Sequence, residues 1–144
     1  MTPADTEQRR AARRAYLAVN IIFAGVILLI MGYSVFYSPD EEKYPVPCVH
    51  EKITGAQCPS CGLSHAFSLI VRGSFDEAVE WNRASAWVFI FFAFQLLLRI
   101  ALGLKFTFTD RYIRQISIAD STVSTISAIA AFFPFLKALG QTLF

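Results

Sequence analysis

The residues of this chain that could do chemistry are gathered in one short stretch. All three cysteines and both histidines of the 144 residues lie between positions 48 and 65. The centre of the stretch is Cys58-Pro59-Ser60-Cys61-Gly62, with His65 one helical turn beyond Cys61 and with Cys48 and His50 upstream. Thiolate and imidazole groups bind metals, and two cysteines separated by two residues also form redox pairs. The stretch therefore predicts a metal site or a thiol site.

Zinc is the first candidate occupant of this stretch. Zinc in structural sites takes four ligands from Cys and His, and a pair of cysteines separated by two residues supplies two of them. The predicted ligand set is Cys48, Cys58, Cys61 and His65, with His50 as the alternative histidine. Ligands that are loosely held and exposed would instead indicate a metal-handling protein.

Thiol chemistry without a metal is the second candidate. In an oxidising compartment Cys58 would be the attacking thiol and Cys61 the resolving one, since a cysteine at a helix start has a lowered pKa. Membrane thiol oxidases generally relay electrons through a second cysteine pair, and this chain has only Cys48 left over. The plainer interpretation is a disulfide from Cys48 to Cys58 or to Cys61, which staples a loop and contributes roughly 2 to 4 kcal/mol.

The bulk composition assigns the chain to the membrane. Hydrophobic residues make up 55% of it, phenylalanine occurs 14 times, and the mean hydropathy is +0.47. Such a composition is too apolar for an ordinary soluble domain of this length. The formal net charge is only +2 and the basic residues lie at the ends of apolar segments, which argues against a nucleic-acid partner. We expect an all-α integral membrane protein that contacts the lipid bilayer.

The apolar segments predict two or three transmembrane helices in a single membrane domain. Arginines precede the first apolar segment, and Lys and Arg residues follow the second, which places both of those ends in the cytoplasm by the positive-inside rule. The first segment is too long for a cleaved signal peptide, so we expect an uncleaved anchor. The third is softer and could cross the membrane or lie in its interface; we expect it to cross. The predicted parts are a basic cytoplasmic N-terminus (1–15), a first span (16–38), an outer loop with interfacial helices (39–83), a second span (84–104), a cytoplasmic connection (105–117) and a third span (118–144).

The predicted outer loop carries the Cys motif on a short interfacial helix. Three prolines keep residues 39–58 irregular, and a helix is expected from about Cys61 to Gly73. Its apolar side would consist of Leu63, Ala66, Phe67, Ile70 and Val71. Ser74 and Glu77 then form a capping-box pattern, and the helix that they start could run unbroken through Trp81 into the second span.

Residues 58–66, followed by residues 72–78 and Asn82, resemble a known signature. The resemblance is to a widespread family of small bacterial membrane proteins known only as a domain of unknown function, with the pattern C-P-x-C-G-[LM]-T-R-A and then G-[DN]-[LF]-x-x-A and an Asn. It covers roughly residues 48 to 87. Ser64-His65 stand where the family usually has Thr-Arg, so any role of that arginine does not carry over. The resemblance implies a membrane architecture and an important Cys motif, without an activity.

A small accessory subunit is the function that these features favour. Two or three helices leave no room for an enclosed substrate pocket, so we expect the chain to pack against a larger integral membrane complex and not to be an enzyme. The outer Cys/His motif would be structural, held by zinc or a disulfide. The alternatives are a membrane thiol-disulfide oxidoreductase that uses Cys58 and Cys61, and a metal-handling protein. Arg99, inside the second span, is expected to reach the cytoplasmic interface by snorkelling. The expected location is the bacterial inner membrane, with the Cys motif on the periplasmic side.

Overall fold

A computed structural model describes residues 3–36, 60–109 and 111–143, and this part of the chain is helical without any strand. The helices are α1 (Pro3–Phe36), α3 (Leu63–Val71), α4 (Phe75–Trp81), α5 (Ser85–Phe108) and α6 (Ile113–Leu143). This confirms the predicted all-α membrane protein. Cys48, His50, Cys58 and the irregular stretch predicted before Cys58 lie outside the described residues.

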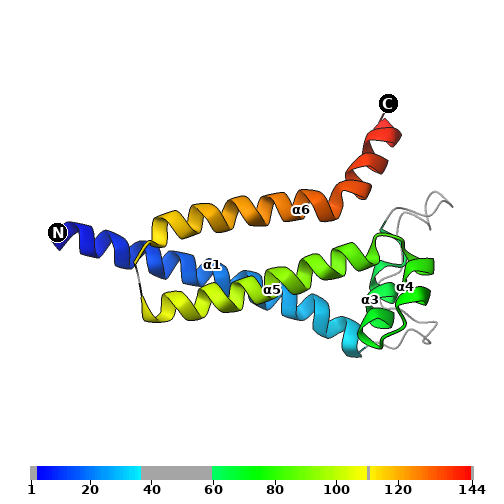
Figure 1. The fold of residues 1–144 in the computed structure, drawn as a ribbon, viewed down its shortest axis with the longest axis horizontal. Coiled ribbons are helices and arrows are strands. Elements are labelled where there is room, and N and C mark those ends of the chain that lie inside the picture. Colours follow the sequence, from blue (N-terminus) through cyan, green and yellow to red (C-terminus); the bar gives the residue numbers. More distant parts are fainter. Residues whose placement is uncertain (1–2, 37–59, 110, 144) are drawn as a thin grey trace.

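Three of the helices are long and apolar enough to cross a membrane. Their candidate spans are Asp5–Phe36, Ser85–Phe108 and Ile113–Lys137, with hydropathies of 2.3, 2.1 and 1.5. Figure 1 shows α1, α5 and α6 extending along the long axis of the molecule, with α3 and α4 at one end and the N-terminus at the other. The third apolar segment therefore forms a helix that is long and apolar enough to cross. Helix α5 ends at Phe108 and α6 begins at Ile113, so both helices extend into the connection expected at 105–117.

The third long helix contains Pro134 and still continues to Leu143. A proline inside a helix removes one backbone donor and clashes with the preceding turn, which bends the helix. Figure 1 shows α6 changing direction toward its C-terminal end, where its last turns point away from α5. The bend separates the C-terminal turns of α6 from the rest of the bundle.

The short helices α3 and α4 form a compact unit, the knob (residues 60–84), at one end of the long helices. The side of α3 that was predicted to be apolar provides half of the buried core, because Ala66, Phe67 and Ile70 are buried while Val71 is exposed. The core is completed by Leu69 of α3, Ala78 of α4 and Val88 of α5. The predicted helix near Cys61 is therefore confirmed, with its regular part at Leu63–Val71.

Two predictions about the residues of the knob are wrong. Ser74 does stand at the N-cap position of α4, but its side chain makes no capping hydrogen bond, so the capping box does not form. The helix also does not run unbroken into the second span, because α4 ends at Trp81 and Asn82 is extended at φ −156° and ψ 113°. The Asn82 side chain stabilises the break by accepting a hydrogen bond from the Ala84 amide at 2.9 Å.

Arg72 ties the knob to the end of α1. Its guanidinium donates to the Val35 carbonyl at 3.3 Å, to the Ser34 carbonyl at 3.5 Å and to the Ser68 carbonyl of its own helix at 2.9 Å. The last carbonyls of a helix have no intrahelical donor, and they carry the negative end of the helix dipole. Arg72, the residue that follows α3, thus caps α1 and connects the unit that carries the Cys motif to the first span.

Candidate functional site

The described part of the Cys motif is a turn that leads into α3. Cys61 is half-buried and is disulfide-bonded. The Asn82 side chain donates to the Cys61 carbonyl at 3.0 Å. Asn82 therefore has two roles. It interrupts the helix between α4 and α5, and it anchors the Cys61 turn at that interruption.

Gly62 allows the turn to approach α4 closely. Its φ of +76° lies in the left-handed region, where residues with a side chain are strained. A Cβ at this position would also lie 3.0 Å from the Trp81 carbonyl oxygen. Glycine is thus required both by the backbone conformation and by the lack of space.

His65 is the other described residue of the predicted metal site. Its ring stacks on Trp81 with 3.9 Å between the ring centroids and 31° between the planes. Within residues 60–109 and the two other described ranges, no group of three His, Cys, Asp or Glu residues could hold a metal ion. Three of the five predicted ligands, Cys48, Cys58 and His50, lie outside those ranges, so the zinc site stays a prediction.

A second site lies among the long helices, where Arg99 of α5 pairs with Asp120 of α6. The two side chains are 9% and 4% exposed, and their bidentate contact has two N–O distances of 2.7 Å. Arg99 lies about 13 Å along the helix axis from Phe108, and Asp120 lies about 10 Å from Ile113. The pair is therefore well inside the spanning segments, where unpaired charges are costly.

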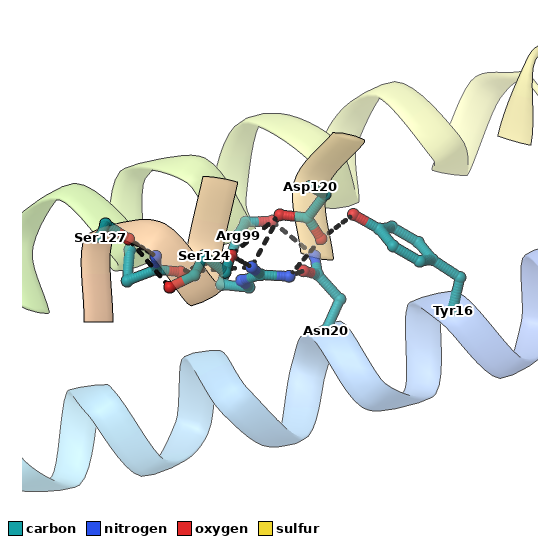
Figure 2. A network of polar contacts seen from close by, with 7 residues as sticks. Tyr16, Asn20, Arg99, Asp120, Ser124 and Ser127 are labelled. Carbon is teal, nitrogen blue, oxygen red and sulfur yellow. Dashed lines mark hydrogen bonds and ion pairs between the residues drawn. The ribbon is translucent and has the colours of Figure 1, made fainter. Parts of the chain in front are cut away.

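Two side chains of α1 form hydrogen bonds with this ion pair, as Figure 2 shows. The Tyr16 hydroxyl donates to the Asp120 carboxylate at 2.8 Å. Asn20 accepts from the Arg99 guanidinium at 3.2 Å and donates to the Arg99 backbone carbonyl at 2.6 Å. A Cβ at position 103 would lie 3.0 Å from the Asn20 amide nitrogen, so Gly103 allows this close contact between α1 and α5.

Polar residues of α5 and α6 extend the network along the bundle (Figure 2). Arg99 also donates to the Ser124 hydroxyl at 2.6 Å and to the Gln95 side-chain oxygen at 3.2 Å. The Gln95 amide then donates to the Ser127 hydroxyl at 3.0 Å. A buried ion pair is favourable only where hydrogen bonds satisfy its remaining donors and acceptors, and this network provides them. We call these seven residues the polar cluster: Tyr16, Asn20, Gln95, Arg99, Asp120, Ser124 and Ser127.

The polar cluster, except for Ser127, forms one part of the lining of a hollow between α1, α5 and α6. The hollow has a volume of about 750 Å³. Most of its wall is apolar, and α6 contributes small side chains there. Those of α6 are Ser121, Ser124, Thr125 and Ala128. The three helices thus meet at the polar cluster and leave space beside it.

The sequence interpretation of Arg99 is wrong. Arg99 does not reach the interface by snorkelling, because its guanidinium is bound to side chains of all three long helices. A signal for the pair was present, since Arg99 and Asp120 have opposite charges at similar depths on two antiparallel spans joined by a short turn.

Comparison with known proteins supports the resemblance of the Cys-containing region. Residues 48–96 match the family described as Protein of unknown function (DUF2752). This match spans the Cys motif, the knob and the first half of α5, and it stops before Arg99. No curated protein and no solved structure matches the chain.

Proposed function

We propose that this chain is a small accessory subunit of a larger bacterial membrane protein complex. The observation that carries the proposal is the hollow between α1, α5 and α6, which leaves three spans incompletely packed against one another. Association of helices in membranes depends on close packing, and small residues at the contact promote it. The α6 wall of the hollow contains such small residues, namely Ser121, Thr125 and Ala128. A transmembrane helix of the partner is the occupant that we propose.

The knob would be a structural element of this subunit on the periplasmic side. Two arguments support a structural role over a catalytic one: Cys61 is disulfide-bonded, and its turn is held by Asn82 and closely packed against Trp81. A disulfide-bonded Cys61 offers no thiolate to a metal. This favours the disulfide form of the motif over the zinc form with Cys48, Cys58, Cys61 and His65.

The proposed orientation has the N-terminus in the cytoplasm of a bacterial inner membrane. Its support is the grouping of positive charge at the end of the bundle that carries the N-terminus and the turn between α5 and α6 (Figure 1). Lys and Arg near span ends are enriched on the cytoplasmic side. The basic residues at this end are Arg9, Arg10, Arg13, Arg14, Lys105, Arg111 and Arg114.

A membrane thiol-disulfide oxidoreductase is the second candidate function. The bonded state of Cys61 is also what the oxidised form of such an enzyme would contain, provided that the partner is Cys58. Mass-spectrometric mapping of the disulfide after proteolysis of the unreduced protein separates the two candidates. A bond between Cys61 and Cys48 supports the structural knob. A bond between Cys61 and Cys58 that a mild dithiol reduces and a quinone restores supports the enzyme.

The accessory role is tested by native mass spectrometry of the gently solubilised protein, combined with elemental analysis for zinc. We expect a stoichiometric larger assembly for the wild-type chain. Thr125→Leu places a larger side chain in the hollow and should release the partner, whereas Thr122→Leu, at an exposed position of the same helix outside the lining, should retain it. A wild-type chain that emerges alone, or a partner that both variants retain equally, would count against the proposal.

A further inference from the structure

A second hollow lies at the basic end of the molecule, where α1 meets the end of α5. Its volume is about 490 Å³, and the described residues that line it are Arg10, Arg13 and Arg14 of α1 together with Phe108 and Thr109. The apolar part of α1 begins directly after Arg14. The hollow therefore lies at the boundary between the hydrocarbon core and the headgroup layer.

The three arginines of this hollow have no counter-charge among the described residues. The one ion pair in the described part of the chain is Arg99 with Asp120, deep in the bundle. No described residue of the lining is acidic; Asp110, next in sequence, lies outside the described residues. Three like charges that share one concave surface repel one another, so an anion in the hollow would be strongly favoured.

Arg13 adds an observation that is independent of charge. Its Nε atom is shielded from solvent and has no hydrogen-bond partner in the described structure. A shielded donor without an acceptor is unfavourable. Arginine offers a planar fork of donors that matches the oxygens of a phosphate group, so a phosphate oxygen beside Arg13 would supply the missing acceptor once a rotation of the side chain turns Nε toward the hollow.

Apolar side chains continue from this hollow into the membrane-spanning part. Phe108 lines the hollow and is 84% exposed, and Leu104, one turn deeper on the same face of α5, is 59% exposed. On α1, Ile21 lies two turns deeper than Arg14 and is 69% exposed. A ligand with an anionic head and acyl chains would contact both the arginines and these side chains, whereas a free anion would contact only the arginines.

We propose that this hollow binds the phosphodiester headgroup of an anionic phospholipid from the adjacent membrane leaflet. The neighbouring basic hollow makes a suitable contrast. It has a volume of about 670 Å³ and contains Arg9, Arg111 and Arg114, but Asp5 also lines it and offsets part of their charge. The proposal concerns lipid binding by this chain alone and does not depend on the accessory role.

The test is native mass spectrometry of the full chain in a non-ionic detergent with equal amounts of two lipids. Dioleoylphosphatidylglycerol and dioleoylphosphatidylcholine have the same acyl chains, so the ratio of their adducts reports the headgroup. For the wild-type protein we expect adducts of the anionic lipid to predominate. Each arginine at a membrane surface contributes roughly a fivefold preference, so three contribute about a hundredfold.

Two triple variants with the same loss of charge separate a site from a diffuse basic surface. Arg10→Gln/Arg13→Gln/Arg14→Gln should abolish the preference for the anionic lipid, and Arg9→Gln/Arg111→Gln/Arg114→Gln should leave most of it. Equal losses in the two triple variants would overturn the proposal, because net charge would then explain the binding. If the first triple variant does not fold, the single variant Arg13→Gln decides: roughly a fivefold loss supports the site and an unchanged ratio overturns it.

Inorganic phosphate distinguishes the lipid from a free anion. At millimolar concentration it should not displace the phosphatidylglycerol adduct, because it makes no contact with the apolar side chains below the arginines. Displacement of the lipid by phosphate alone would assign the hollow to a free anion and overturn the lipid proposal.

Discussion

The Arg99 guanidinium is the most constrained charged group that the structure describes. Five of its hydrogen bonds end on side chains of four residues from α1, α5 and α6. Of these four, only Asp120 carries a formal charge. Each of the two ions is therefore tolerated inside the membrane mainly because the other is present.

We predict that this pair shows strong coupling in a double-mutant cycle. Arg99→Met leaves Asp120 as a buried unpaired charge, Asp120→Leu leaves Arg99 unpaired, and each should lower the free energy of unfolding by about 3 to 5 kcal/mol. The double variant should lose much less than the sum of the two. Unfolding in mixed micelles measures the cycle, with Lys105→Met as a control at an exposed charge of α5. Additive losses would contradict the assignment of a coupled pair.

The turn at Gly62 gives a second prediction at the scale of a single residue. Gly62 and Gly73 both have positive φ, at 76° and 88°, but only Gly62 has an atom of Trp81 where a Cβ would be placed. Gly73→Ala should therefore cost about 1 to 2 kcal/mol for the left-handed backbone, and Gly62→Ala should cost more. Thermal unfolding followed by tryptophan fluorescence compares the two variants. Equal losses would show that contact with Trp81 is unimportant.

Residue-scale features could be predicted from sequence where local pattern decides them. Ala66, Phe67 and Ile70 follow helical spacing, and all three are buried as expected. Arg99 could not be placed from its own segment, because its position depends on Asp120, which is distant in sequence, and on Asn20, which is further still. Position near the end of an apolar run suggests snorkelling, and only the packing of three helices overrides that preference.

At the scale of elements, the junction between α4 and α5 depends on one side chain. Asn82 accepts a hydrogen bond from the Ala84 amide and donates one to the Cys61 carbonyl. The sequence pattern from Ser74 to Trp87 favours one continuous helix, but the helix is interrupted at Asn82. The extended conformation of Asn82 is stabilised by its hydrogen bond to the Cys61 turn. The residue pattern along a single helix does not reveal this contact. The helix break is thus a tertiary feature.

We predict that substitution of Asn82 loosens the knob in two separable steps. Asn82→Asp retains an acceptor for the Ala84 amide but loses the donor to the Cys61 carbonyl, whereas Asn82→Ala loses both. Each hydrogen bond contributes about 0.5 to 1.5 kcal/mol, so Asn82→Ala should be the less stable of the two. Hydrogen exchange of amides in residues 75–88 measures the local opening. Faster exchange in Asn82→Asp than in Asn82→Ala would contradict this account.

At the scale of the whole molecule, two charge patterns act at different depths. Basic residues at the ends of α1, α5 and α6 could be read directly from the sequence, because topology rules depend on composition near the ends of spans. The polar cluster in the middle could not, because it requires that α1, α5 and α6 meet at one level. The three spans could thus be predicted segment by segment, while their contact through Tyr16, Arg99 and Asp120 is visible only in the assembled bundle.

Crossing of the membrane by α1 and α5 predicts a definite pattern of accessibility on its two faces. Gln8→Cys, near the start of α1, and Arg111→Cys, in the turn between α5 and α6, should react with a membrane-impermeant maleimide from the same side. Glu77→Cys, an exposed position of α4 in the knob, should react only from the opposite side. Intact cells and inside-out vesicles provide the two orientations, and the wild-type chain gives the background from its own cysteines. Because α1 and α5 connect the knob to both other sites, labelling of all three positions from one face would mean that these helices do not cross. Labelling of Gln8→Cys from outside intact cells, with Glu77→Cys protected, would keep the crossings and reverse the proposed orientation.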